Sequence, residues 1–378
     1  MARWQKRARV GVGLFGIVFA IVVYAAIGER QTAAPVPAPS RLDPRAILES
    51  AGAAFQRFQE ARKDFVVKAE RQLTYEGGAT KFIGVTIEVR NRGGRDFMVS
   101  GREAEASNDN RQLEITGEVR LTASDGFTVT AGQATFNEVD ATVHVPGAVS
   151  FGKGRMSGSG VGMTYNQGTD VLSLARDAHV TVTDEAGKPT TEFRAGAATL
   201  SRQENYLALE GHVRALRENQ VLEAERGVAR LSENEEYITF IELRGNARVA
   251  GGGAFDSMSA RDIDLDYTAD GETLERVVLA GKGGIVMSGD ESGPGQQFVG
   301  ESLEATFAPD SSLKTVVGRG DVQVDLPARP GAPARRVTAQ TFEAAGEPGQ
   351  GLRSARFSDS VEYREEARAG RPSRTARS

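Results

Sequence analysis

Cysteine is absent from the 378 residues of this sequence, and histidine occurs only three times. The first absence excludes disulfides, iron–sulfur clusters and cysteine nucleophiles, and the second leaves few residues for metal ligation or acid–base catalysis. Neither sign of charge dominates, because 46 basic residues stand against 51 acidic ones and the formal net charge is −5. A chain without a basic excess gives no reason to expect a nucleic-acid partner.

No motif of a catalytic site is present in the sequence. Each glycine–lysine pair leads to glycine or proline, so a phosphate-binding loop is missing. Asp262, Asp264 and Asp266 alternate along one expected strand, where a solvated face explains them better than a calcium site. We therefore expect no enzyme, no metal site and no other cofactor. The three histidines are also expected on a solvent-exposed face: His144, His179 and His212.

A long uncharged segment, residues 10–28, follows a basic segment at residues 1–9. At about 1.5 Å per residue, a helix of this length spans roughly 28 Å, close to a bilayer core of about 30 Å. The positive-inside rule then puts the N-terminus in the cytoplasm and the bulk of the chain across the membrane. The alternative is a cleaved signal peptide ending at Ala25, although secretory apolar regions usually run about 7–15 residues.

Four further segments follow the expected transmembrane helix. Residues 29–42 are rich in proline and alanine and form a linker. Residues 43–62 predict a short amphipathic helix, because Asp43 can cap it and apolar residues recur at helical spacing. From residue 63 to residue 363 the apolar period is two, with glycine, asparagine and aspartate at the turns, as in stacked β-strands. The arginine-rich tail, residues 364–378, is expected to be disordered and unable to form a capping strand.

The β region is internally repeated, with units of about 30 to 39 residues. Each unit has a first strand with a small–x–bulky signature, a polar turn, and a second strand centred on a small or turn-forming residue. Nearly all positions two and four residues from these centres are apolar, whereas the odd positions between them are mostly polar. The expected centres are Gly117, Gly147, Ala178, Gly211, Gly245, Gly281, Gly320 and Asp359.

The even positions share one face of each strand, so every unit is a hairpin with one apolar and one wet face. A single hairpin cannot bury its apolar face, but a stack of hairpins can. The central glycines are expected on the apolar face, forming a crease along the inside. The candidate lining of an apolar groove is Leu113, Ile115, Val119, Val143, Val145, Leu207, Leu209, Val213, Ile241, Leu243, Val277, Leu279 and Val322.

The anchor, the linker and repeats such as Leu207-Ala-Leu-Glu-Gly-His-Val213 and Leu113-Glu-Ile-Thr-Gly-Glu-Val119 resemble lipopolysaccharide-export periplasmic proteins. These are the LptC family and its soluble relative LptA, which share the OstA-like β-jellyroll. The resemblance implies an elongated, twisted all-β jellyroll behind a single transmembrane helix. The β region is about twice the usual LptC size, so two jellyrolls in tandem are possible.

The resemblance also implies a function and a location. The protein would sit in the inner membrane with its bulk in the periplasm, and would hold the acyl chains of lipopolysaccharide in its groove. It would receive the lipid from an inner-membrane ABC transporter and pass it to a soluble LptA-like bridge protein. Two other classes stay open: a membrane-anchored β scaffold or adhesin with a filled core, and a periplasmic β-helix enzyme, which would need a polar cluster that the sequence does not show.

The two ends of an open stack are unpaired edges, and such edges recruit strands from other chains. We expect the first edge at residues 65–73, close to the membrane and to the transporter. The distal edge is expected at residues 352–363, where the LptA-like partner would add its own strand.

Overall fold

The computed structural model describes residues 42–378, apart from 60–61, 93, 108–111, 138, 185, 218, 234–236, 253–254, 290–292, 331, 348–350 and 367–372. The basic segment, the predicted transmembrane helix and nearly all of the predicted linker lie in residues 1–41, outside the described part. Within the described part, no helix is long and apolar enough to cross a membrane. The described residues are all-β, as the sequence predicts.

The strands follow one another along the chain without helical interruption in the described ranges. The first eleven are β1 (Leu48–Gln59), β2 (Arg62–Thr74), β3 (Thr80–Arg92), β4 (Arg95–Ala106), β5 (Gln112–Ala123), β6 (Thr128–Asn137), β7 (Thr142–Lys153), β8 (Met156–Asn166), β9 (Val171–Thr183), β10 (Pro189–Ala195) and β11 (Ala197–Ser201). The others are β12 (Tyr206–Arg217), β13 (Gln220–Leu231), β14 (Ile238–Ala250), β15 (Phe255–Tyr267), β16 (Leu274–Met287), β17 (Gln297–Phe307), β18 (Leu313–Leu326), β19 (Arg335–Glu347), β20 (Gly351–Ser358), β21 (Glu362–Glu365) and β22 (Arg374–Arg377).

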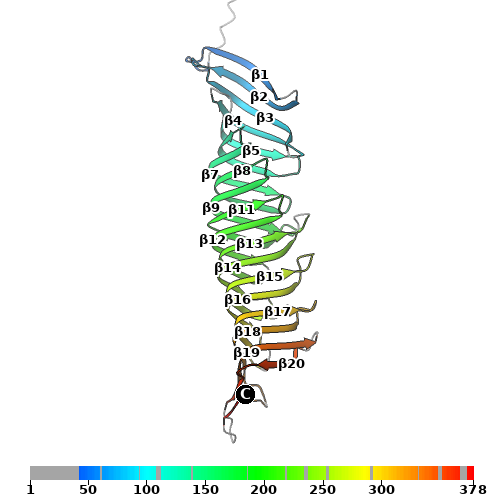
Figure 1. The fold of residues 1–378 in the computed structure, drawn as a ribbon. Helices are drawn as coiled ribbons and strands as arrows, with labels where there is room; N and C mark the ends of the chain where they lie inside the picture. The colour runs from blue at the N-terminus through cyan, green and yellow to red at the C-terminus, as the bar shows by residue number, and fades with distance from the viewer. Residues whose placement is uncertain are drawn as a thin grey trace, which may run out of the picture.

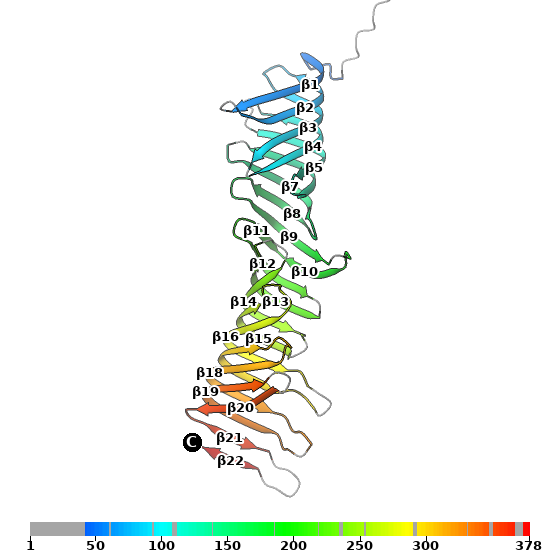
Figure 2. The same ribbon diagram turned by 90° about the vertical axis from the view of Figure 1, so that its right-hand side faces the viewer.

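Neighbours in sequence are antiparallel neighbours in space, so the strands form one continuous, elongated stack (Figures 1 and 2). The middle of the stack departs from simple pairing, because β10 and β11 both pair with β9 and with β12. They are the two halves of one strand interrupted at Gly196, where an added Cβ would lie 3.1 Å from the carbonyl oxygen of Glu210. Local antiparallel pairing from end to end gives the stacked hairpins that the sequence predicts.

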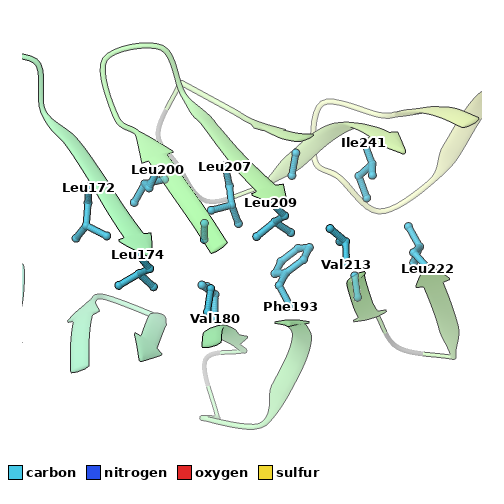
Figure 3. Close-up of a cluster of buried hydrophobic side chains, with 14 of the residues drawn as sticks. Leu172, Leu174, Val180, Phe193, Leu200, Leu207, Leu209, Val213, Leu222 and Ile241 are labelled. Atoms are coloured by element: carbon cyan, nitrogen blue, oxygen red, sulfur yellow. The ribbon is translucent and has the colours of Figure 1, made fainter. Parts of the chain in front are cut away.

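The interior lies between the two halves of this bent sheet. Buried residues alternate with exposed or half-buried ones on both sides of the middle of β12, as the burial of Leu207, Leu209 and Val213 shows. Because successive side chains of a strand point to opposite faces, the buried ones share one face of the sheet. In Figure 3, Leu207 and Leu209 meet Val180, Phe193 and Val213 from the opposite wall. One hydrophobic cluster therefore extends along the stack.

The second strand of most units bends at two consecutive residues with left-handed backbone conformation. In β12 the step inserts one extra residue between Glu210 and Val213 relative to β13, which is a β-bulge. Bulges bend and twist a strand, and here each one turns the strand from one wall of the interior to the other. The steps are Gly117–Glu118, Gly211–His212, Gly245–Asn246, Gly281–Lys282 and Gly320–Asp321.

The predicted crease of glycines along the inside is wrong. A Cβ built on the central glycine would collide with exposed polar side chains of the neighbouring strand, not with the core. Glycine is needed there because it accepts a positive φ and lets the preceding strand pass closely on the outer side. The collisions are Gly117 with Arg102, Gly245 with Glu225, Gly281 with Arg261 and Gly320 with Glu301.

The predicted centre of the third unit, Ala178, is also wrong. Ala178 is buried, whereas the left-handed residue of β9 is Asp177 and the bend lies at Arg176–Asp177. Arg176 therefore occupies the position that glycine holds in the other units. The sequence pattern gave the wrong centre because Arg176 stands where the pattern expects glycine, so the centre was placed two residues too late.

The helix predicted over residues 43–62 does not form. Asp43 does accept the backbone N–H of Arg45, but the turn ends there and β1 begins at Leu48. Backbone pairing with β2, such as Ala53 with Ala69, satisfies the main chain along most of β1. Tertiary pairing of this kind overrides a weak helical periodicity. The first edge of the stack is therefore β1 and not residues 65–73.

The C-terminal tail is not wholly outside the sheet, which contradicts the disordered tail predicted for residues 364–378. Strand β22 pairs with β21, and the guanidinium of Arg377 lies 3.3 Å from the carboxylate of Glu362. Glutamates on β21 face arginines on β22, so charge attraction compensates for the lack of apolar residues. The distal end therefore has two parts: β20, paired with β19, and the β21–β22 hairpin.

Because the central glycines are needed at the bend, two glycines of β16 should differ in how well they tolerate substitution by alanine. Gly281 has a φ of +76° and its added Cβ would lie 2.9 Å from the Cβ of Arg261. Gly281→Ala should lower the free energy of unfolding by about 2 kcal/mol, because alanine is strained in this conformation. Gly284 has no such φ and its Cβ would meet Ser259 at an ordinary 3.6 Å. Gly284→Ala should change the free energy of unfolding, measured with urea, by less than about 0.5 kcal/mol. Equal losses of stability in the two variants would contradict the requirement for glycine at the bend.

Candidate functional site

An apolar hollow lies between the walls formed by β3 to β8. The space between the lining side chains, counted together with its opening to solvent, is about 590 Å³. Its lining has 14 residues, and Gln167 is the polar one among them. The others are Ile87, Val89, Val99, Ile115, Val119, Leu121, Val129, Ala131, Ala134, Phe136, Val143, Val145 and Met163.

All thirteen predicted groove residues are buried in the interior, so the predicted inward face is correct. They do not share one site. Ile115, Val119, Val143 and Val145 line the hollow. Leu207 lines a second hollow of about 250 Å³ farther along the stack. The remaining eight are core residues elsewhere: Leu113, Leu209, Val213, Ile241, Leu243, Val277, Leu279 and Val322.

The sequence reasoning missed much of the lining of the hollow. Ala134, Phe136 and Met163 stand on the first strands of their units, in the small–x–bulky signature that the repeat contains. That signature could have identified them, since it places them on the same face as the predicted residues. Ile87 and Val89 lie before the first counted centre, so the repeat alone could not include them.

The interior is filled more completely in the distal part of the stack. Phe342 packs between Phe298 and Phe357, with ring centroids 5.7 Å and 4.9 Å away. The guanidinium of Arg217 lies 4.3 Å from the centroid of the Tyr267 ring, over its face. Large side chains that are essentially inaccessible are concentrated here: Met258, Ile263, Leu265, Leu279, Ile285, Phe298, Leu303 and Phe342.

The turns between antiparallel strands lie alternately at the two ends of the strands, so they form two rows along the stack, which we call the rims. The bend in the strands brings the two rims toward each other, and we call the space between them the mouth of the fold. A charged cluster joins the rims beside the hollow; we name it the clasp, and it consists of Arg95, Asp125, Lys153, Tyr165, Asp170 and Arg202. Arg95, Asp125 and Lys153 lie at turns of one rim, and Tyr165, Asp170 and Arg202 lie at turns of the other.

Two arginines make the contacts that cross between the rims. The guanidinium of Arg95 lies 2.8 Å from the carboxylate of Asp170 and donates to the hydroxyl of Tyr165 at 2.7 Å. From the other rim, the guanidinium of Arg202 lies 3.0 Å from the carboxylate of Asp125. The ring of Tyr165 also meets that of Phe127 at 6.1 Å. Residues 70 or more positions apart in sequence are therefore tied together at the mouth of the fold.

Burial shapes the protonation of the clasp. Burial raises the pKa of the Tyr165 hydroxyl, and the neighbouring Asp170 carboxylate raises it further, so Tyr165 stays protonated. Burial also acts to raise the pKa of Asp125. The backbone N–H of Phe127 and the guanidinium groups of Arg202 and Arg95 outweigh it and hold this pKa below its usual range. Asp125 is therefore ionised at neutral pH, and its contribution to stability is lost only in acid.

The outer face shows no sign of catalytic chemistry in the described residues. Asp264 and Asp266 pair with Arg244 and Arg276, as expected for a solvated strand face. No group of histidines and carboxylates in the described ranges could hold a metal ion. The histidines lie on the outer side as predicted: His144 and His212 are exposed, and His179 lies 2.8 Å from Glu192.

The clasp predicts a measurable coupling between its partners. The side chains of Arg95 and Asp170 are only 13% and 16% exposed, so a double-mutant cycle with Arg95→Gln and Asp170→Asn should give about 2 kcal/mol. The matched control is Arg102 with Glu118, which are 69% and 77% exposed and should give at most about 1 kcal/mol. Equal coupling energies in urea unfolding would show that the clasp is an ordinary surface pair.

Comparison with known proteins finds a family model that matches the proximal part of this chain. Residues 16–184 match the family model described as lipopolysaccharide-assembly, LptC-related. The matched range includes every lining residue of the hollow and all of the clasp except Arg202. No curated protein matches the chain. Over residues 16–184 the chain is therefore similar to the LptC-related lipopolysaccharide-assembly proteins.

Proposed function

We propose that this protein binds lipopolysaccharide by its acyl chains and passes it along a route from the inner membrane toward the outer membrane. The observation that supports this most is the apolar hollow, which lies entirely inside the segment that matches the LptC-related family model. Such a protein is a carrier and not an enzyme. Energy for transfer would come from an ABC transporter in the inner membrane.

The physical chemistry of the hollow suits acyl chains. Each methylene group that leaves water contributes about 0.8 kcal/mol, and this contribution requires no directional bonds. Thirteen apolar side chains can therefore hold a chain without fixing its register, which allows a lipid to slide. Sugars and phosphates would stay outside, because the interior offers few groups to replace their hydration.

The proposed location is the inner membrane, with a single N-terminal span at residues 10–28 and the β stack in the periplasm. The proximal end of the stack supports this arrangement. Ile47 and Leu48 are exposed at the start of β1, and among the described strands β1 pairs with β2 alone. An unpaired edge beside exposed apolar side chains suits docking to the periplasmic part of the transporter.

The packed distal part favours a second role for residues beyond about 250. Its phenylalanines and aliphatic side chains fill the interior, as in the scaffold alternative. We propose that this part is a spacer that extends the hollow-bearing part toward the outer membrane. An adhesin or scaffold without any lipid ligand remains the alternative for the whole chain.

The distal end is the proposed contact with a soluble LptA-like bridge protein. Among the described strands, β20 pairs with β19 alone, so its other edge is open for a partner strand. The β21–β22 hairpin leaves this edge of β20 free. A partner strand would add by backbone hydrogen bonds and continue the stack.

Site-specific photo-crosslinking tests the lipid-binding proposal. Val145 lines the hollow and is 1% exposed, whereas its neighbour His144 is on the outer face. A small diazirine side chain at position 145 should capture lipopolysaccharide, and the same side chain at position 144 should not. Thermal unfolding of both variants checks that the stack is intact. No capture at position 145, or equal capture at both positions, would contradict the proposal.

The distal-edge proposal predicts an effect of proline in β20. Ala355 is exposed in the middle of this strand, and Ala355→Pro removes one backbone N–H. Binding of the LptA-like protein in a pull-down should fall at least about tenfold. Ala355→Thr keeps the N–H and suits a strand, so it should bind as the original protein does. Unchanged binding of Ala355→Pro would place the contact elsewhere.

A further inference from the structure

Gln167 is the one polar residue among the fourteen that line the apolar hollow. Its Oε1 atom is buried and has no hydrogen-bond partner among the described residues. A buried acceptor without a donor is unfavourable, since it has lost its water and gained nothing in return. Such an atom needs an explanation, and a ligand that supplies the missing donor is one.

The turn that carries Gln167 is held in place from several sides. The backbone N–H of Gln167 donates to the carbonyl of Ala141 at 3.0 Å. The side-chain oxygen of Asn166 accepts the N–H groups of Gly168 and Thr169 at 2.9 Å and 3.0 Å. A side chain mounted on a turn this well bonded is preorganised, as a recognition group must be.

The position of Gln167 also indicates which part of a ligand it meets. Tyr165 and Asp170, in the same turn region, belong to the clasp at the mouth of the fold. Gln167 therefore stands where the apolar hollow meets the charged mouth. A chain lying in the hollow with its polar end toward the mouth would pass Gln167 close to that polar end.

Resting on the proposed acyl-chain binding, we propose that Gln167 is a specificity-determining residue. It selects acyl chains that carry a hydrogen-bond donor, a hydroxyl or an amide N–H, near their polar end. The donor group would bond Oε1 of Gln167 while the rest of the chain fills the hollow. A plain chain would leave the acceptor unpaired, and sites built to accept a hydrogen bond discriminate against ligands that cannot donate one.

Three fatty acids that differ at one atom position test this selection with the full-length protein. Myristate has no donor on its chain, β-hydroxymyristate has one, and β-methoxymyristate has the oxygen without the hydrogen. Calorimetry should show β-hydroxymyristate binding about tenfold more tightly than the other two. Gln167→Met, which is apolar and of similar length, should remove this preference and bind all three alike.

A matched control and a second measurement separate selection from a structural role. Gln203, in the next turn of the same rim, donates from its side chain to the carbonyl of Gly168 at 3.3 Å. Gln203→Met should keep the preference for the hydroxylated chain. Gln167→Met should melt at the same temperature as the original protein or higher in the absence of ligand, because it removes an unpaired buried acceptor.

The outcomes distinguish this inference from the function on which it rests. If all three fatty acids bind the original protein with equal affinity, a chain does occupy the hollow but Gln167 selects nothing, and the inference is overturned. Retention of the preference by Gln167→Met overturns it as well. If none of the three binds, both the inference and the acyl-chain binding proposal fail.

Discussion

The bend in the middle of each long strand is the constraint on which the rest of the structure depends. A stack of straight hairpins would have one apolar face with nothing to cover it, and no second sheet is present in the described residues to do so. The two-residue left-handed step folds each strand so that its own two halves cover each other. The central glycines are needed because other residues are strained there, and because the adjacent strand passes within van der Waals distance on the outer side.

The bend creates an interior along the whole stack, but side-chain size decides whether that interior is open. Between β3 and β8 most of the lining residues are valine, alanine and isoleucine, with Leu121, Phe136 and Met163 among them, and a hollow remains. From β15 onward phenylalanine, leucine and methionine meet in the middle and fill it. The same backbone design therefore encloses a hollow in one part of the stack and a filled interior in another. The open part lies within the segment that matches the LptC-related family model, which supports the proposed carriage of a lipid there.

The sequence was sufficient to predict the features that depend on local periodicity. Alternation at Leu207, Leu209 and Val213 predicts a buried face, and that face is buried. It was not sufficient where pairing partners decide the outcome. Residues 48–59 have a helical spacing of apolar residues, yet the free edge of β2 recruits them as a strand. The arginines of the tail suggested disorder, yet the glutamates of β21 give them partners.

The site is harder to predict from the sequence than the fold is, because its residues come together only across the mouth of the fold. Arg95 and Asp170 are far apart in the chain, and neither belongs to the apolar pattern that defines the repeat. The hollow itself depends on the summed volume of side chains from six strands, which no single unit encodes. Position within the repeat predicts the direction of a side chain, but not whether an opposing side chain fills the space in front of it.

The polar groups at the mouth give the hollow a direction. An apolar cavity alone would hold an acyl chain in either orientation, since burial depends on area and not on sequence along the chain. The clasp places half-buried charges on one side of the hollow, and these charges are satisfied by one another across the rims. A chain with a polar end gains from placing that end toward the clasp and loses by burying it among valines. The charged mouth and the apolar walls would therefore orient a bound amphiphile together, and neither could do so alone.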